Sequence, residues 1–529
     1  MSLESEVATT QPEPKKKWFR WNLFSKSKDP THNSTHDDTN YTDQSHNNPV
    51  DSPHSVSPNN STHHVDERHP LLASELTTAE LSALIRERRL AKLISITQFL
   101  VAIVDIVWIV LILFDVLSGI GVQPTQGSGF VSLFVTCLAL FGLSWSILIP
   151  TTKSTDNTLN TITCGVLLLD VVIILATREI YRTVGLTPLL VSFILAELSI
   201  LISMASYDCG DASTLFRKAR QAFKYIMRLA MCIAASLLTV NLLLHAFDTH
   251  TDVGTVYTIN DTKIRLTCLS LDSTGPVAIV EAGDTPSTEL YSWVSTVNGF
   301  KTVCYWDHPG YGMSENAPSP LSLGTTAKYL QRALEMDPHI SDEDELVLVA
   351  HGTGSLFARV FGGRTSYKVA GVVLIEPLHE VLYQQQQSVG HGIGLLIKGI
   401  LSTCSYRNVK GLLTGHGSVD RVFGNLSLSK PGVYKFLLQQ QLTARTISAT
   451  EIITSPLEMK TPLLLLSSSS MCIDQTWTKY QRLHLKLTEN AVAWKIIAGP
   501  HDLWRTPQGL QETKKEIEQF LNLAVHTQE

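Results

Sequence analysis

One stretch of the chain has the layout that positions a reactive side chain: LVLVAHGTGSLFARVF, from Leu346 to Phe361. An apolar run of strand character ends at small residues and passes at once into a segment of helical character. This is the arrangement of a nucleophile elbow, a tight turn that lifts a reactive side chain over an oxyanion hole. Gly352 stands where the nucleophile belongs and has no atom that could attack a substrate. The stretch therefore predicts either an enzyme fold that has lost its activity or an enzyme that works without a side-chain nucleophile.

A second group of residues that could do chemistry consists of three acids in apolar surroundings, Asp105, Asp170 and Glu197. Each falls near the middle of a different apolar segment. A charged side chain inside a bilayer is costly, so we expect these acids to face a bundle interior or a watery cavity, or to be protonated. They could relay protons or cations. We favour the alternative, in which neutral acids hydrogen-bond across helices and hold the bundle together.

The element that must hold these acids is an all-α bundle of about five transmembrane helices within residues 76–248. In chain order, the expected spans are residues 94–114, 130–149, 159–176, 186–205 and 225–247. Each approaches the roughly 20 apolar residues that cross a bilayer. The third is the shortest, and a buried core helix could have the same pattern.

Positive charge indicates the direction of these spans. IRERRLAK precedes the first span and FRKARQAFK separates the fourth from the fifth, whereas the loop VLSGIGVQPTQGSG between the first two is uncharged. Because Lys and Arg are enriched in cytoplasmic loops, the N-terminal tail should be cytoplasmic. An odd number of spans then places residues 249–529 in a lumen or outside the cell, although Arg178 and Arg182 would lie on the less favoured side.

Two kinds of residue in this outer part fit a lumenal location. Asn260 and Asn425 begin glycosylation triplets, so we expect a glycoprotein. The outer cysteines are Cys268, Cys304, Cys404 and Cys472. They could pair in an oxidising lumen, but they lack the spacing of a disulfide framework, so we expect free buried thiols.

The N-terminal tail, residues 1–75, is rich in Asn, Ser, Thr and His and should be disordered. Its stretch DERHPLL, with Glu67, Leu71 and Leu72, resembles the acidic dileucine signals that sorting adaptors read on vacuolar and lysosomal membrane proteins. We therefore expect a sorting adaptor as a partner and a vacuolar or other endomembrane address. A chance leucine pair ahead of a helix is the alternative. The net charge of -6 and the lack of a long basic block argue against a nucleic-acid partner.

From about residue 257, short apolar runs alternate with stretches of helical character. The runs are PVAIVEA, KTVCYW, ELVLVA, VAGVVLI, PLLLLS and AWKIIAG. Strands separated by helices imply a mostly parallel α/β sheet that is covered on both faces. Ligands of such sheets bind at the carboxyl ends of the strands, which is where the elbow lies.

Residues 257–523 resemble the α/β-hydrolase superfamily through four motifs in the family's order. The motifs are VAIVEAGDTPSTELYSW, DHPGYGMS, LVLVAHGTGSLFARVFGGRTSYKVAGVVLIEPLHE and IIAGPHDLWRTPQGL. The resemblance implies an α/β-hydrolase-like domain over residues 249–529 with a cap inserted at about 377–459, preceded by the transmembrane bundle. The cap's most apolar piece, HGIGLLIKGILSTC, is expected to be either a buried cap helix or a lid that touches lipid.

The resemblance also implies candidate site residues. Gly283, Asp284 and Thr353 fall where the oxyanion loop and ligand contacts are expected. His501 matches the catalytic histidine of the family, with Glu376 and Asp474 as alternative carboxylate partners. The departure is at Gly352, where the family has Ser, Cys or Asp. Loss of such a nucleophile costs roughly a million-fold in turnover, or about 8 kcal/mol of barrier.

These features together predict an integral membrane protein whose lumenal domain is a pseudoenzyme. We expect it to bind or scaffold an apolar or lipid-like ligand, and we expect no metal and no cofactor. One alternative is an active hydrolase or lyase in which His501 and a carboxylate act as a general base. The other is proton-coupled transport through Asp105, Asp170 and Glu197.

Overall fold

The computed structural model of the chain describes residues 78–118, 127–149, 154–178, 180, 184–205, 215–248, 254–271, 273–283 and 285–526. The expected tail with its signal at Glu67, Leu71 and Leu72 lies outside the described residues. So does Asp284.

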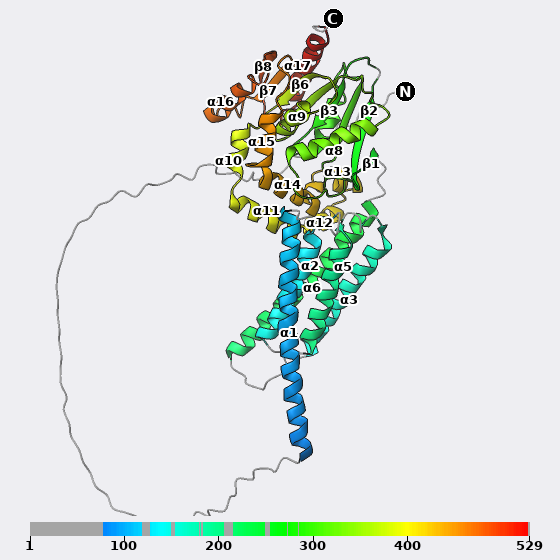
Figure 1. The fold of residues 1–529 in the computed structure, drawn as a ribbon, viewed down its shortest axis with the longest axis vertical. Helices are drawn as coiled ribbons and strands as arrows, with labels where there is room; N and C mark the ends of the chain where they lie inside the picture. Colours follow the sequence, from blue (N-terminus) through cyan, green and yellow to red (C-terminus); the bar gives the residue numbers. More distant parts are fainter. Residues whose placement is uncertain are drawn as a thin grey trace, which may run out of the picture. The chain divides into compact units, whose positions relative to one another are not determined.

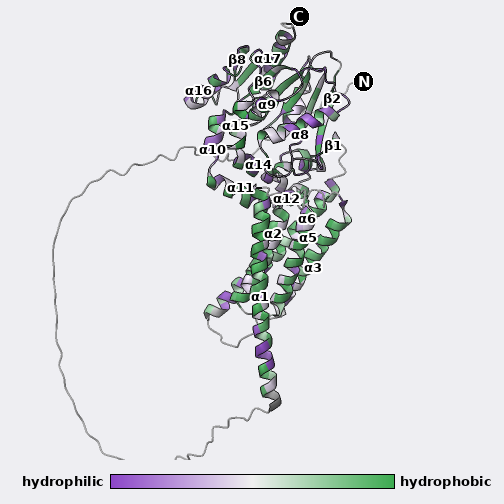
Figure 2. Cartoon of the chain, viewed as in Figure 1, coloured by the Kyte–Doolittle hydropathy of each residue, from purple (hydrophilic) through white to green (hydrophobic). Residues whose placement is uncertain are grey.

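Five helices in the described part of the N-terminal half are long and apolar enough to cross a membrane (Figures 1 and 2). They are α1 (Thr78–Ser118), α2 (Phe130–Leu148), α3 (Ser154–Ala176), α5 (Thr187–Met204) and α6 (Leu215–Asp248). The five apolar helices that the sequence predicts are confirmed, and the third has a spanning stretch of 22 residues. Outward side chains are apolar too, since Phe99 is 64% exposed and Ile194 is 66% exposed. Helices that are apolar all round are typical of membrane spans.

The described part of the C-terminal half is built on an eight-stranded sheet in the order β1-β2-β4-β3-β5-β6-β7-β8 (Figure 1). The strands are β1 (Thr255–Ile259), β2 (Thr262–Ser270), β3 (Val277–Glu281), β4 (Thr302–Trp306), β5 (Leu346–His351), β6 (Val369–Ile375), β7 (Leu463–Ser468) and β8 (Ala491–Ile497). β2 is antiparallel to β1 and β4, and all other pairs are parallel. The fold is an α/β-hydrolase-like mixed sheet, as the sequence predicts.

The sequence pattern identifies β3 to β8 but misses the hairpin of β1 and β2. That hairpin turns at Asn260 and Asp261, which have φ angles of 48° and 60°. Asn and Asp tolerate this left-handed region, so an Asn-Asp pair between two runs rich in β-branched residues was the available signal.

Two apolar cores cover the two faces of the sheet. One core includes side chains of α8 (Leu323–Met336) and α9 (Gly354–Gly362), among them Leu330 and Phe357. The other includes side chains of α7 (Ser287–Val294) and α17 (Pro507–His526), among them Trp293 and Phe520. This double coverage explains why the central strands are apolar throughout rather than alternating.

Cap helices lie between β6 and β7. They are α10 (Glu380–Gln386), α11 (Val389–Ser402), α12 (Tyr406–Leu413), α13 (Ser418–Phe423), the short 3-10 turn η1 (Ser427–Ser429), α14 (Pro431–Thr443) and α15 (Ile447–Thr454). The apolar piece that the sequence singles out forms α11. Its Gly399 packs on Phe130 of α2 so closely that a Cβ at Gly399 would lie 2.4 Å from the ring. The outer domain and the helix bundle are therefore in direct contact.

One expectation about the cysteines is wrong. Cys268 and Cys304 form a disulfide rather than remaining free. They are direct partners in the antiparallel register of β2 and β4, which brings their Cα atoms to 4.1 Å. Strand register, and not spacing along the chain, makes this pairing possible. Cys404 and Cys472 are free.

Candidate site at the elbow and the pocket beside it

The elbow retains the backbone of a nucleophile turn. Gly352 follows β5, has a φ of +57° and leads directly into α9. An added Cβ at Gly352 would meet nothing within 4 Å. The turn therefore has space for a side chain that the sequence does not supply.

The oxyanion loop also keeps its close packing on the elbow. Gly283 has a φ of +63°, and a Cβ on it would lie 2.6 Å from the Gly354 nitrogen and 2.7 Å from the His351 oxygen. A side chain at this position would push the two turns apart. The two turns therefore pack closely around a glycine at position 352.

Two nearby groups could be considered as substitute nucleophiles. The Ser355 hydroxyl is fully buried and donates a hydrogen bond to the Gly352 carbonyl at 2.7 Å. The Cys472 thiol lies near Glu376, and burial together with the charge of Glu376 raises the pKa of this thiol. A thiol with a raised pKa is a poor source of the reactive thiolate. Neither group replaces the missing side chain.

The family histidine position has a carboxylate partner. His501 Nδ1 lies 3.1 Å from Glu376 Oε2. Glu376 follows β6, is fully buried, and accepts a second hydrogen bond from the Ser468 backbone. These contacts fix the carboxylate beneath an imidazole whose side chain is 41% exposed.

Asp474, the other carboxylate that the sequence suggests, does not contact His501. It begins α16 (Gln475–His484) and accepts hydrogen bonds from the backbone nitrogens of Thr476 at 2.7 Å and Trp477 at 3.4 Å. Because Asp474 follows the end of β7 by several residues, it lies away from the edge of the sheet and caps the next helix.

We expect Asp474→Ala to lower the free energy of unfolding by about 1 kcal/mol, because a helix cap is lost. Thermal unfolding of the full chain in detergent measures this. A loss of several kcal/mol would show that Asp474 has a role beyond the cap.

A pocket beside the elbow holds about 500 Å³ of empty space, part of it open to solvent. Its apolar wall includes Leu356, Phe357, Phe436 and Leu437. Thr353 and Gly283 of the elbow and oxyanion loop also line it. A mostly apolar lining with a few polar groups is typical of small-molecule sites.

The polar end of this pocket contains a pair that the sequence did not predict. Glu281 Oε1 lies 2.6 Å from His308 Nε2, and Glu281 Oε2 accepts a hydrogen bond from Trp306 Nε1 at 2.9 Å. Within the described residues, His308 Nδ1 is buried with no hydrogen-bond partner. The available signal was Glu281, an acid at the end of an apolar strand where many family members have His-Gly. Its partner could not be read from the sequence.

The pair His501–Glu376 and this pocket are separate features. Among the described residues, His501 is not part of the pocket lining. Its ring lies 4.9 Å from the His351 ring and 6.2 Å from the Trp477 ring, measured between centroids. A ligand in the pocket would therefore contact Glu281 and His308 before it met His501.

His351, His501 and Asp502 form a group whose ligand atoms lie within 4.8 Å of one another and could hold a metal ion. Burial, assisted by the neighbouring His501, lowers the pKa of His351 to about 3 and keeps its imidazole neutral. Arg505 Nε, however, already lies 2.8 Å from Asp502 Oδ2. Because this guanidinium satisfies the carboxylate, the group offers little negative charge to a cation.

The intramembrane acids each contact a different helix. Asp105 accepts a hydrogen bond from the Ser199 hydroxyl at 2.9 Å, and Glu197 is hydrogen-bonded to Cys164. Asp170 lies beside Thr239, whose hydroxyl donates to the Ala235 carbonyl at 3.2 Å. Between the described residues, no hydrogen bond or ion pair joins any two of these acids. Both carboxylate oxygens of Asp170 are buried with no hydrogen-bond partner among the described residues, and the structural role and the relay both stay predictions.

The asparagines of the two glycosylation triplets are exposed, whereas the third residues of the triplets, Thr262 and Ser427, are buried. Asn260 is exposed in the turn between β1 and β2, and Asn425 is exposed between α13 and η1. The modification itself stays a prediction.

Comparisons with known proteins address the two halves separately. Residues 20–210 match a family model described as "Region of unknown function (DUF2417)", a range that contains α1, α2, α3 and α5. An uncharacterised protein of Schizosaccharomyces pombe is 28% identical over 291 residues, which cover 48% of this chain and 54% of that protein. An uncharacterised vacuolar membrane protein of Saccharomyces cerevisiae is 24% identical over 295 residues, which cover 47% of this chain and 46% of that protein. The chain spans about half the length of these curated relatives.

Solved structures resemble about half of this chain. MenH from S. aureus is 13% identical with a TM-score of 0.36, covering 49% of this chain and 98% of its own. A lipase in its open form is 14% identical with a TM-score of 0.37, covering 51% and 97%. An esterase from Exiguobacterium antarcticum is 13% identical with a TM-score of 0.35, covering 51% and 100%.

Proposed function

We propose that this membrane protein uses its α/β-hydrolase-like domain to bind an apolar or lipid-like ligand without hydrolysing it. The observation that carries the proposal is Gly352, which leaves an elbow of normal backbone with no side-chain atom to attack an ester. A triad without its nucleophile loses roughly a million-fold in turnover. Ligand binding does not require a nucleophilic atom at position 352.

The pocket beside the elbow is the proposed ligand site. Its wall of Leu356, Phe357, Phe436 and Leu437 suits an aliphatic or aromatic group. The pair Glu281–His308 at its polar end suits a single hydroxyl, carbonyl or carboxyl group, because it places polar side chains in an otherwise mostly apolar lining.

We also propose a vacuolar membrane address with the outer domain in the lumen. The relative from Saccharomyces cerevisiae carries the name of a vacuolar membrane protein. The disulfide between Cys268 and Cys304 and the exposed asparagines Asn260 and Asn425 support an oxidising, glycosylating compartment for this domain. Under this proposal, a cytosolic sorting adaptor reads Glu67, Leu71 and Leu72.

A binding measurement on the full chain in detergent tests the ligand proposal. We expect a fluorescent short-chain fatty acyl probe to bind and to be released intact. Leu437→Trp fills the pocket and should weaken binding at least tenfold, whereas Leu442→Trp, on the exposed side of the same helix, should not. Equal binding by both variants would place the ligand elsewhere.

A second candidate function rests on the 3.1 Å contact between His501 and Glu376. Such a pair could remove a proton from water or from an acidic C–H bond. It predicts turnover that is lost in His501→Ala and insensitive to serine-directed probes. Absence of turnover in the unaltered chain, with probe binding retained, leaves the binding function as the better account.

A further inference from the structure

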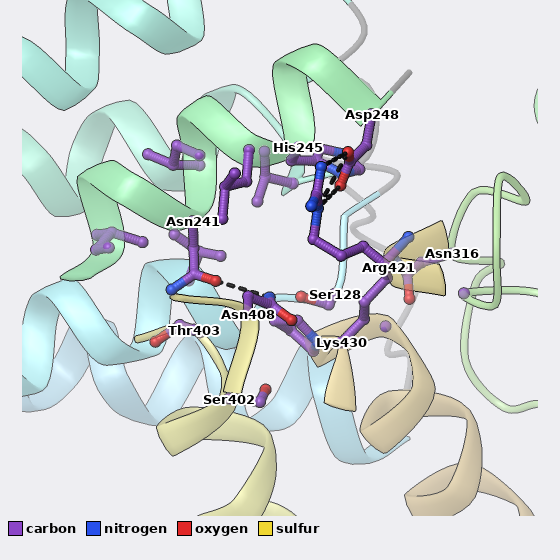
Figure 3. A pocket seen from close by; sticks show the side chains of 18 of the residues that line it. Ser128, Asn241, His245, Asp248, Asn316, Ser402, Thr403, Asn408, Arg421 and Lys430 are labelled. Carbon is purple, nitrogen blue, oxygen red and sulfur yellow. Dashed lines mark hydrogen bonds and ion pairs between the residues drawn. The ribbon is translucent and has the colours of Figure 1, made fainter. Parts of the chain in front are cut away.

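A second pocket lies between the ends of the membrane helices and the cap (Figure 3). It holds about 840 Å³ of empty space, part of it open to solvent. The membrane helices contribute the apolar Val131, Leu238 and Leu242 and also the polar Asn241, His245 and Asp248. The cap contributes Asn408, Arg421 and Lys430. Figure 3 shows these polar side chains gathered around one cavity.

The pocket lies at the level where a membrane surface is expected. Ser128 and Val131 lie at the start of α2, and Leu244 and Asp248 lie at the end of α6, so one end of the spans forms its edge. The ends of spanning helices mark the border between acyl chains and head groups.

The cap helix beside the pocket also suits a lipid surface. α11 carries Val389, Ile393, Ile397 and Leu401 at four-residue spacing, and each is at least 50% exposed. Residues four apart lie on one helix face. The next residue, Ser402, lines the pocket. The apolar surface of the bundle therefore continues along α11 to the edge of the pocket.

The charges around the pocket leave one positive charge over. Arg421 forms a two-pronged ion pair with Asp248, at 2.8 Å from Nη2 to Oδ1 and 3.1 Å from Nε to Oδ2 (Figure 3). Arg265 and Asp307, which also act on Lys430, form a second pair at 2.7 Å. Lys430 Nζ donates to the Gly312 carbonyl at 3.1 Å, an uncharged partner.

Burial of the Lys430 ammonium costs free energy, and a bound anion would reduce that cost. Burial lowers the pKa of Lys430 to about 8, while Asp248 and Asp307 oppose that effect. His245 of α6 also faces this lysine. At neutral pH the ammonium is mostly protonated, and a negative group beside it would compensate for lost hydration.

We propose that this pocket binds a membrane lipid with a negatively charged phosphate head group, the phosphate at Lys430 and the acyl chains along α2 and α6. An ammonium and a phosphate oxygen form a charge-assisted hydrogen bond, which is among the stronger polar contacts in proteins. Asn408 lines the same pocket and donates a hydrogen bond to Asn241 Oδ1 at 2.7 Å. The apolar residues Val131, Leu238 and Leu242 and the cationic Lys430 in one pocket suit an amphiphile better than a wholly polar solute.

This proposal does not rest on the function proposed for the elbow pocket. Its residues are distinct from those that line the elbow pocket. Failure of one proposal would therefore leave the other standing.

The test uses the full chain, purified in detergent and stripped of lipid. Short-chain phosphatidylglycerol, phosphatidylcholine and inorganic phosphate are titrated separately, and the dissociation constant is taken from the shift in the unfolding midpoint. We expect phosphatidylglycerol to bind at least tenfold more tightly than phosphatidylcholine. Inorganic phosphate at millimolar concentration should give no comparable shift.

Variants of Lys430 test whether this lysine binds the phosphate group. Lys430→Gln should weaken phosphatidylglycerol binding at least tenfold, Lys430→Arg should stay within about threefold, and the exposed Lys410→Gln should have no effect. Because the anion binds the protonated amine, affinity in the unaltered chain should fall as the pH rises through about 8, and Lys430→Arg should lose this dependence.

Three results would overturn the proposal. They are equal affinity for the two lipids, unchanged binding by Lys430→Gln, and a shift by phosphate alone that matches the lipid. Should Lys430→Gln fail to fold, native mass spectrometry of the unaltered chain taken from membranes decides. Retention of anionic phospholipid supports the proposal, and retention of phosphatidylcholine alone contradicts it.

Discussion

Replacing Gly352 by Ser should make the elbow react with a serine-directed fluorophosphonate probe. The substitution suits the site because Gly352 already has the positive φ of an elbow and an added Cβ meets nothing within 4 Å. The pair His501–Glu376, 3.1 Å apart, is available to accept the hydroxyl proton. A full triad contributes roughly a million-fold, so even a poorly aligned serine should raise the labelling rate a hundred-fold or more above the unaltered chain.

Gly352→Ala is the matched control, since it adds the Cβ without the oxygen. It should fold like Gly352→Ser and remain unlabelled. In the Gly352→Ser background, His501→Ala and Glu376→Gln should each remove most of the labelling. Labelling that survives both changes would show that the pair does not serve this turn.

Arg421→Ala should cause a large decrease in the free energy of unfolding. Arg421 and Asp248 are both buried, at 9% and 5% exposure, and their ion pair joins the cap to the end of α6. Removing the arginine breaks a buried ion pair, which costs roughly 3–5 kcal/mol of unfolding free energy. Thermal unfolding of the full chain in detergent should record a marked decrease in the midpoint.

Two comparisons test the cause of that loss. Arg407→Ala, at an exposed position of the same cap, should change stability by less than about 0.5 kcal/mol. The double change Arg421→Met with Asp248→Leu removes both charges and should recover most of the loss. If the double variant is no more stable than Arg421→Ala, the ion pair is not the reason.

Much of the fold could be predicted because its signals are local. The spans are long apolar segments, and β3 to β8 are short apolar runs separated by helical stretches. The elbow could also be predicted, because its strand, glycine and helix are contiguous in the sequence. The departure at Gly352 was visible at once against the surrounding motif.

The parts that could not be predicted depend on contacts between distant segments. Arg421 and Asp248 are 173 residues apart, and Cys268 and Cys304 meet only through the register of β2 and β4. The choice of Glu376 over Asp474 depended on where the chain leaves the sheet edge. Glu281 and His308 pair because β3 and β4 are neighbours in the sheet.

The most direct test of the central claim is the intact mass of the unaltered full chain after incubation with the fluorophosphonate probe. The absence of a nucleophile at position 352 predicts no adduct on the outer domain, alongside retained binding of the fatty acyl probe. A single adduct on that domain that disappears in His501→Ala would contradict the account, because it would reveal a working nucleophile beside the histidine.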